Sequence, residues 1–428
     1  MIELIAVELR KLIHTFRLPA LAFGAVLLWL LSGHSAGVRY RTDLESYDRN
    51  VNLELERIER VREAGWHSQF IVQFLLPPAR SALLLDAGAQ YLPDVVAYEI
   101  GQIDRVRYSS TLRYNFALPR FLRLDWTFIL LYVMSFGALT LSFDLVSGER
   151  ERGTLRLLLS YPVRRAVVLG GKFFAVMLSL WVVILLGSVG SLLVFVGETG
   201  VSLEGADLVA IGIWWLAAVL YLGAFVAVGM LFSTACRNSP QALYWSLAAW
   251  VILVLGVPAA SQVAAEVWRP ALRTSEVDRM LSLEAAKQIA EVAADPSRAN
   301  WDAEEWRRRI AEMYNRQLRS AFAQVELAER LSLVSPNGLF LAVMARTLRA
   351  GVYRLEDFIA ETWLAVRQYA EAVEREGTVP AHPLLQLRSA WERTRIVDPP
   401  WSLWLFLAAW VAAAEVLAVV ILVRSDIE

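Results

Sequence analysis

Apolar residues along this chain gather in six runs, separated by segments in which charged residues return. The runs occupy residues 16–32, 126–146, 167–196, 208–233, 242–263 and 402–423. An α-helix needs about 17–25 apolar residues to cross a bilayer, so each run predicts a transmembrane helix. The third run is longer than a span requires, which predicts a tilted helix or one that continues beyond the membrane.

The residues before the first run predict an amphipathic helix. In residues 1–16, apolar side chains recur at helical spacing among acidic and basic ones: Ile2, Ile5, Leu9, Leu12, Ile13 and Phe16. A helix of this kind lies on a membrane surface. Because the first run is short, a cleaved signal peptide is the alternative. The acidic residues of the lead argue against it, and we expect the first span to be retained.

Two long segments interrupt the series of spans. Residues 33–125 begin with a predicted helix, marked by Val51, Leu55, Ile58 and Val61, and continue in short apolar stretches broken by Pro and Gly, several of which suit strands. Residues 264–400 are predicted to be mostly helical. There the stretch SPNGLFLAVMARTLRAG has a Ser-Pro helix start. The apolar face of that helix could lie along the outer membrane interface, but ordinary packing within a folded outer layer is the favoured interpretation.

Composition agrees with a membrane protein that also carries folded segments outside the bilayer. Hydrophobic residues make up 57% of the 428 residues, above the roughly 45–50% of soluble domains, yet 20% of the residues are charged. The predicted fold class is therefore an α-helical polytopic membrane protein. It has six transmembrane helices, an N-terminal amphipathic helix and two mainly helical extracytoplasmic segments, the first of them partly β.

Basic residues indicate the orientation, because Lys and Arg in short loops favour the cytoplasmic side. They occur before the first span, between spans two and three, between spans four and five, and after span six, whereas residues 197–207 hold only acidic charges. With six spans, this pattern places both termini and residues 147–166 in the cytoplasm. Residues 33–125 and 264–400 are then extracytoplasmic.

Residues 147–166, which we call the charged loop, contain the run SGERERGTLRLLLSYPVRR. Gly148 and Gly153 bracket interleaved Glu and Arg residues, a leucine cluster follows, and Pro162 ends the predicted short helix. One interpretation is a basic membrane anchor with solvated charges. The mixed charges and apolar side chains favour a second interpretation, a docking helix that fills a groove on a soluble partner.

The sequence contains no recognisable catalytic motif. Gly171-Lys172 lacks the first Gly and the hydroxyl of a phosphate-binding loop. Glu149 and Glu151 are two residues apart, so they point to different faces of a helix and do not form an acid–base pair. A single Cys and four scattered His make a metal site improbable. The net charge of −1 gives no argument for nucleic acid as a partner. Glu415, inside the last run, is either a functional contact or a partner for a polar group on a neighbouring helix.

The run FDLVSGERERGTLRLLLSYPVRRAVVLGGK resembles the signature loop of ABC-2 type permeases, the membrane subunits of type-2 ABC exporters. The family pattern is met in order by Glu149, Glu151, Gly153, Thr154, Leu155, Leu158, Leu159, Pro162, Arg165 and Lys172. The six spans and the amphipathic lead also fit. The stretches PPARSALLLDAGAQYLP and SPNGLFLAVMARTLRAG resemble a bacterial branch with large extracytoplasmic inserts. The second outer segment is larger than in exporters with compact outer loops, so the resemblance does not extend to the substrate.

The resemblance implies a permease without catalytic activity of its own in the bacterial inner membrane. ATP and Mg would bind a separate ATP-binding-cassette subunit, and two identical or related permeases would enclose the transport path. The helix of the charged loop would be the coupling helix. Glu149, Glu151 and Arg152 are its expected polar contacts to the ATPase, and Leu155, Leu158 and Leu159 its apolar ones.

In the family, spans two and five face the partner permease across the transport path. The residues that this places beside the path are Tyr132, Met134, Phe136, Tyr244, Trp245, Trp250 and Pro258, with Glu415 as a further candidate from span six. An aromatic, nearly uncharged path suits an amphiphilic or hydrophobic cargo such as a lipid, a peptide or a drug-like molecule. The alternative for these aromatics is lipid contact or core packing.

Two other functions remain open. One is a membrane scaffold or sensor whose outer segments bind a ligand, or a periplasmic protein, and whose charged loop binds a cytoplasmic protein other than an ATPase. The second is an ion-coupled transporter, which requires buried carboxylates or broken helices in repeated halves. Only Glu415 hints at it, and the two halves of the chain show no repeat.

Overall fold

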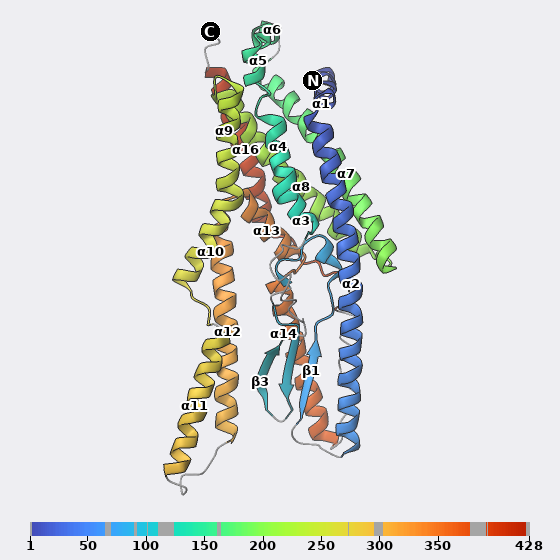
Figure 1. Cartoon of the computed structure of the whole chain (residues 1–428), viewed down its shortest axis with the longest axis vertical. Helices are drawn as coiled ribbons and strands as arrows, with labels where there is room; N and C mark the ends of the chain where they lie inside the picture. Colours follow the sequence, from blue (N-terminus) through green and yellow to red (C-terminus); the bar gives the residue numbers. More distant parts are fainter. Residues whose placement is uncertain are drawn as a thin grey trace.

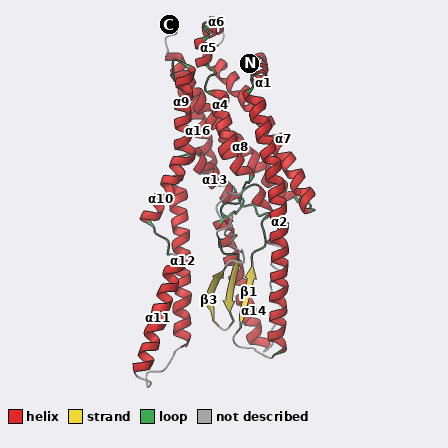
Figure 2. Ribbon diagram, in the orientation of Figure 1, coloured by secondary structure: helices red, strands yellow, loops and turns green. Residues whose placement is uncertain are grey.

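The computed structural model is an elongated helical molecule (Figures 1 and 2). It describes residues 2–64, 70–89, 92–100, 102–109, 124–160, 164–272, 274–294, 303–376, 391 and 393–424. Both chain ends and helices α1 (Ile2–His14), α5 (Ser147–Glu151) and α6 (Thr154–Ser160) lie at one end, which we call the loop end. A three-stranded sheet with its helices occupies the opposite end, which we call the far layer.

Within these described residues, six helical stretches are long and apolar enough to cross a membrane: Arg17–Glu63, Trp126–Glu151, Arg165–Thr199, Gly205–Ala235, Ser239–Trp268 and Trp401–Arg424. They contain the six predicted runs, except for Phe16 at the start of the first run. Helices α2 (Arg17–Glu63), α7 (Arg165–Thr199), α8 (Gly205–Ala235) and α16 (Trp401–Arg424) are continuous. Helix α2 continues without interruption from the first predicted span into the far layer, where Val51 and Ile58 of the predicted helix face are buried.

Helices α2 and α7 pack closely because small residues line their contact. A Cβ at Gly33 would lie 2.3 Å from the backbone oxygen of Ser191, and one at Gly187 would lie 2.1 Å from the ring of Trp29. Small side chains of this kind let transmembrane helices approach one another. The fully buried Trp29 fills the space next to Gly187.

Spans two and five contain π-helical turns, near the start of span two and at mid-length in span five. Span two comprises α3 (Trp126–Phe128), η3 (Ile129–Met134) and α4 (Ser135–Ser142), and span five comprises α9 (Ser239–Trp250), η4 (Val251–Gly256) and α10 (Val257–Trp268). Such turns leave backbone groups without their usual helical partner. In span two, Tyr221 of α8 donates to the oxygen of Leu131 at 3.1 Å. In span five, the amide of Asn337 donates to the oxygen of Val254 at 3.0 Å.

Asn337 belongs to α13 (Pro336–Thr347), which is buried among α8, α16 and η4. This burial agrees with the favoured interpretation of ordinary packing. Ser335 caps its first turn, and a Cβ at Gly338 would lie 2.0 Å from the backbone oxygen of Ser332. The helix is apolar on most of its circumference, and this suits burial between spans better than an interfacial position.

Asn337→Leu is expected to lower the free energy of unfolding by about 1–2 kcal/mol, since it leaves a buried carbonyl unpaired. Pro258 has no N–H for the carbonyl of Val254, four residues earlier. In a Pro258→Ala background the restored N–H is available to that carbonyl, so the cost of Asn337→Leu should shrink. Denaturant titration of the four proteins in mild detergent measures this difference. Equal costs in both backgrounds would show that Asn337 does not replace the missing donor.

The far layer holds the predicted strands and most of the second long segment. Strands β1 (Ile71–Leu75), β2 (Val95–Glu99) and β3 (Gln102–Ser109) form an antiparallel sheet in that order, with Val72 opposite Tyr98 and Val96 opposite Tyr108. The short helix η1 (Arg80–Leu83) follows β1. Helix α14 (Val352–Glu376) covers the sheet through Phe358 and Val366. Helices α11 (Thr274–Ala294) and α12 (Ala303–Ser332) stand beside it, and α12 contacts β3.

Candidate functional site: the charged loop and its buried ion cluster

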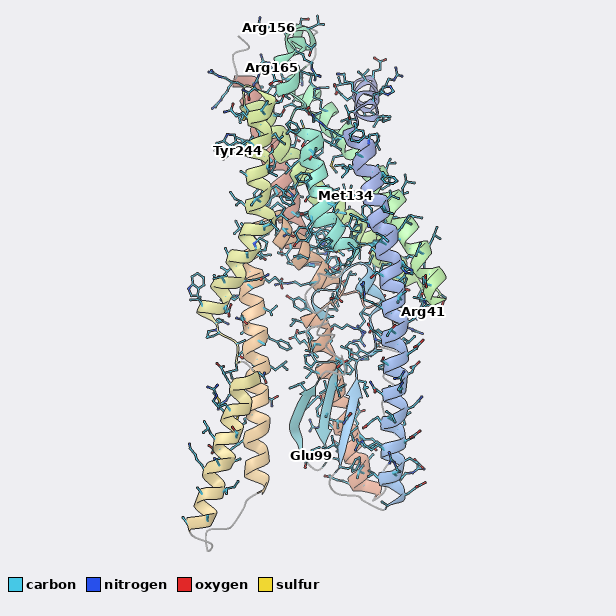
Figure 3. The ribbon with its side chains drawn as sticks, in the orientation of Figure 1. Arg41, Glu99, Met134, Arg156, Arg165 and Tyr244 are labelled. Atoms are coloured by element: carbon cyan, nitrogen blue, oxygen red, sulfur yellow. The ribbon has the colours of Figure 1, made fainter. Side chains whose placement is uncertain are left out.

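The charged loop projects from the loop end as two short helices, α5 and α6, with Arg156 near its tip and Arg165 at its base (Figure 3). Gly153 joins the helices with a φ of +71°, a left-handed conformation that glycine adopts without strain. This turn reverses the chain between the acidic residues of α5 and the leucines of α6.

Four charged side chains meet beneath the loop. The Lys172 ammonium, at the start of α7, lies 2.8 Å from Oε1 of Glu149 and 3.0 Å from Oε1 of Glu8. Lys11 lies 3.0 Å from Glu8 and 3.4 Å from Glu149. We call these four residues the ion cluster. It links the amphipathic helix α1, the charged loop and span three.

The ion cluster is largely withdrawn from water. Lys172 is 1% exposed, and Glu8 and Glu149 are also buried. Burial by itself raises the pKa of Glu8, but Lys172 and Lys11 outweigh that effect and hold this pKa below its usual value. Burial by itself lowers the pKa of Lys11, but Glu8 and Glu149 outweigh that effect and hold this pKa above its usual value. The cluster is therefore stable only as a set, because removing one partner leaves a buried charge uncompensated.

A second set of contacts ties the loop to spans four and five. Glu151 accepts hydrogen bonds from the backbone N and the Oγ of Ser239, at 2.8 and 2.9 Å, and so binds the first turn of α9. Arg150 donates to the oxygens of Cys236 and Thr234 at the end of α8, at 2.5 and 3.3 Å. Glu149 and Glu151 thus point in different directions, as their spacing predicts, and each binds a different part of the membrane bundle.

The base of the loop is also bound to the last span. Arg165 donates to the oxygens of Leu422 and Val423 at 2.7 and 3.0 Å. A cation at a helix C-terminus is favourable because unpaired carbonyls gather there. Through these contacts and the ion cluster, the loop is connected to α1 and to spans three, four, five and six.

The predicted coupling residues divide into an inner and an outer group. Glu149 and Lys172 face the ion cluster, and Leu155 is 2% exposed in the main core. Arg152 and Thr154 are exposed, as are Arg156 and Leu157 of α6, which were not among the predicted contacts. Pro162 lies outside the described residues, and the side chains of Leu158 and Leu159 are not described.

The predicted path residues do not share one surface. Phe136 of span two stacks edge-on against Trp250 of span five at 5.7 Å, and Trp250 donates to Oγ of Ser135 at 2.8 Å. Tyr244 and Trp245 are exposed on the same span, whereas Met134 is fully buried inside the chain. The remaining candidates, Tyr132, Pro258 and Glu415, are partly buried. Within the described part of the chain, Oε1 of Glu415 has no hydrogen-bond partner.

Four residues of the site were not found from the sequence. Glu8 and Lys11 complete the ion cluster, Arg150 donates to carbonyls at the end of α8, and Ser239 donates to the Glu151 carboxylate. A signal for the first two was available. Lys172 sits at the mouth of a span, where a buried ammonium requires a carboxylate, and Glu8 and Lys11 are three residues apart on one helix. The pairing itself depends on how α1 folds back onto α7.

These features define a membrane-spanning helical protein whose charged loop is bonded to several of its transmembrane helices. The family model of the ABC-2 family transporter proteins matches residues 20–427, and the chain belongs to this family. Two relatives are each described as a probable ABC transporter permease protein, NosY, from Stutzerimonas stutzeri and from Pseudomonas aeruginosa. Each is 33% identical over 125 residues, which are 29% of this chain and 45% of the relative. The chain thus matches less than half the length of these relatives.

Proposed function

We propose that this chain is the permease subunit of an ABC exporter in a bacterial inner membrane, with both termini and the charged loop in the cytoplasm. A separate ATP-binding-cassette subunit would bind ATP and Mg and dock on the loop. A second permease, identical or related, would complete the transport path. Membership of the ABC-2 family supports the proposal, as do the names of the two relatives. The location of the loop at the same end as both termini agrees with it.

The observation that carries the proposal is the way the charged loop is held. Its tip is exposed, while Glu149, Glu151 and Arg165 bind three different parts of the bundle. We therefore expect a displacement of α6 to move the spans to which the loop is bonded. ATP-driven closure of the ATPases would shift the population between inward- and outward-facing states, to the extent that the ATPase binds the two states differently.

The second permease is expected to cover span five. The exposed apolar residues of span five include Tyr244, Trp245 and Ile252, and the π-helical turn η4 lies in the same span. Phe136 and Trp250 connect this surface to span two. An aromatic surface between two permeases suits an amphiphilic cargo, and the π-helical turns give both spans a place to bend.

The test is capture of the ATPase by exposed residues of α6. We expect Leu157→Asp, together with Arg156→Glu, to abolish co-purification of an ATP-binding-cassette ATPase from native membranes in mild detergent. Both side chains are exposed, so the fold should survive. Arg60→Glu is the matched control, because it reverses an exposed charge of the far layer and should leave capture intact. Glu149→Ala is unsuitable here, since it disturbs the buried ion cluster.

The outcomes separate the permease from the scaffold. Capture by the wild type and by Arg60→Glu, but not by the α6 variant, supports docking through the charged loop. If a well-folded wild-type chain captures no such ATPase, the permease proposal is withdrawn and the scaffold becomes the better interpretation. Equal capture by all three proteins would show that the ATPase docks on a surface other than α6.

A further inference from the structure

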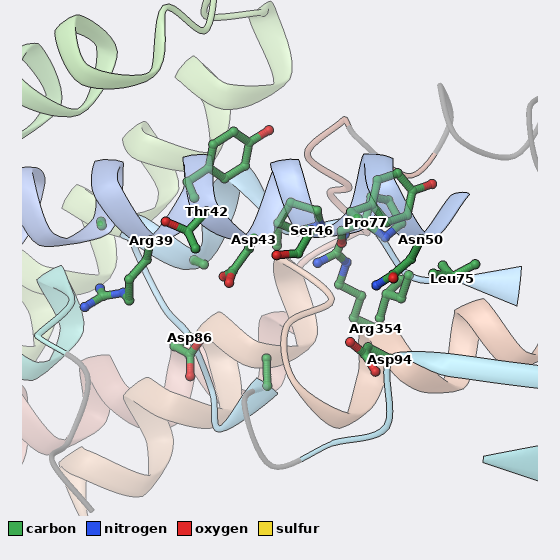
Figure 4. Close-up of a pocket in the computed structure, with 18 of the residues that line it drawn as sticks. Arg39, Thr42, Asp43, Ser46, Asn50, Leu75, Pro77, Asp86, Asp94 and Arg354 are labelled. Atoms are coloured by element: carbon green, nitrogen blue, oxygen red, sulfur yellow. The ribbon is translucent and has the colours of Figure 1, made fainter. Parts of the chain in front are cut away.

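A cavity of about 600 Å³ lies where α2 leaves the bundle for the far layer (Figure 4). Its walls come from α2, from the segment around η1, and from Arg354 of α14. Phe195, in the last turns of α7, and Ala36 also line it. The cavity is therefore next to the ends of spans one and three. Its size is within the range of small-molecule sites, roughly 300–1,000 Å³.

Arg354 supplies a cation to this cavity. Its Nη2 donates to the backbone oxygens of Pro77 and Trp391, at 2.8 and 3.2 Å. Among the described residues it forms no ion pair with a carboxylate; the neighbouring charge is Arg395, which binds Glu361 at 2.6 and 3.0 Å. Burial lowers the pKa of Arg354 to about 10, so the side chain is still charged at neutral pH.

Arg354 is partly buried, and a guanidinium withdrawn from water and bonded only to carbonyls is costly unless an anion joins it. Both carbonyl contacts of Arg354 come from Nη2, which leaves the Nε and Nη1 donors available to a ligand. A phosphate or carboxylate accepts from such a fork in a bidentate manner.

The α2 side of the cavity carries acidic, basic and hydroxyl groups, with Arg39 and Arg49 beside Asp43. Figure 4 shows the Arg354 side chain directed toward α2, where Asp43 and Ser46 lie, with Asp94 close to the same opening. The cavity thus presents both signs of charge on α2, and Arg354 adds a cation from α14. This arrangement suits a ligand that carries both an anionic and a cationic group.

We propose that this cavity binds a zwitterionic phosphate ester of the phosphoethanolamine type, with its phosphate on Arg354 and its ammonium on the Asp43 wall. The ligand is either the headgroup of a membrane lipid or a soluble molecule with the same chemistry. The position of the cavity beside the ends of two spans puts it within reach of both. The inference is independent of the proposed docking of an ATPase.

The experiment uses the full chain in nanodiscs of phosphatidylglycerol alone, titrated with phosphoethanolamine while the thermal unfolding midpoint is followed. The wild type should show a saturable rise. Arg354→Gln keeps hydrogen-bond donors but loses the charge and should weaken binding about 10- to 100-fold. Ala82→Phe fills the cavity without altering Arg354 and should have a similar effect. Arg60→Gln, outside the lining, is the control and should bind as the wild type does.

A second set of nanodiscs contains phosphatidylethanolamine and distinguishes the two sources. If the lipid headgroup is the ligand, the site is already filled and the response to phosphoethanolamine disappears in the wild type. If a soluble molecule is the ligand, the response persists; either result supports the site. The proposal is overturned if the wild type shows no saturable response in phosphatidylglycerol nanodiscs. It is also overturned if Ala82→Phe and a folded Arg354→Gln respond like the wild type.

Discussion

Replacing Lys172 with methionine is expected to lower the free energy of unfolding by about 3–5 kcal/mol, the usual cost of removing one partner from a buried ion pair. Lys172 lies within 3.0 Å of both Glu8 and Glu149. Without it, two buried carboxylates face each other with only the half-exposed Lys11 to offset them. Denaturant titration in mild detergent measures the loss.

Two variants show whether charge is the cause. Lys172→Met combined with Glu8→Gln and Glu149→Gln removes the unpaired carboxylates and should regain most of the lost stability. Arg165→Met removes the other cation near the start of the same helix. Arg165 binds carbonyls at a helix end that is partly exposed, and we expect a loss of about 0.3–1 kcal/mol. Similar losses for Lys172→Met and Arg165→Met would argue against a special role for the ion cluster.

The same cluster predicts a pH dependence. The folded-state pKa of Glu8 is below its usual value of 4.5. Its contribution to stability is therefore present above that value and is lost as the pH falls through the lower, folded-state pKa. Wild-type protein should lose this stability in acid, and Glu8→Gln should make the acid dependence shallower.

Replacing Gly33 with leucine is expected to disrupt the contact of α2 with α7 and to cost about 3 kcal/mol, at the upper end of ordinary overpacking. Even a Cβ at this position would lie 2.3 Å from the Ser191 oxygen. A backbone atom does not move aside as a flexible side chain does, so the two helices must separate. The loss should appear as a lower unfolding midpoint and as proteolysis near the start of the far layer.

Gly24→Leu is the matched control on the same helix. A Cβ at Gly24 meets no atom within 4 Å, and leucine is a better helix former than glycine by roughly 0.5–1 kcal/mol. Gly24→Leu should therefore be neutral or slightly stabilising. If both variants behave alike, helix propensity governs the result and the close approach of the two helices does not.

The contacts of the charged loop change how its acidic residues are understood. The resemblance to ABC-2 permeases suggests Glu149 as a contact for the ATPase, but in this structure it binds Lys172 inside the chain. Its proposed role is to transmit movement from the loop to α1 and span three. The exposed surface of α6, with Arg156 and Leu157, is the better candidate for the docking contact itself.

The sequence by itself determined the six spans, the family resemblance and the position of the charged loop. Hydrophobic length and the order of Glu, Gly-Thr-Leu and Pro in the charged loop are local properties, so they can be read along the chain. The divergence of Glu149 and Glu151 also followed from spacing alone, because helix geometry sets the direction of neighbouring side chains.

Only the tertiary structure decided which groups meet. Glu8 reaches Lys172 across 164 positions of the chain, and Asn337 reaches the oxygen of Val254 across 83. The same holds for the burial of α13 between spans, for the continuation of α2 beyond residue 33, and for the cavity beside Arg354. Each depends on how whole helices pack. A buried charge or carbonyl requires a partner, but the sequence does not say which of many distant groups the packing will bring to it.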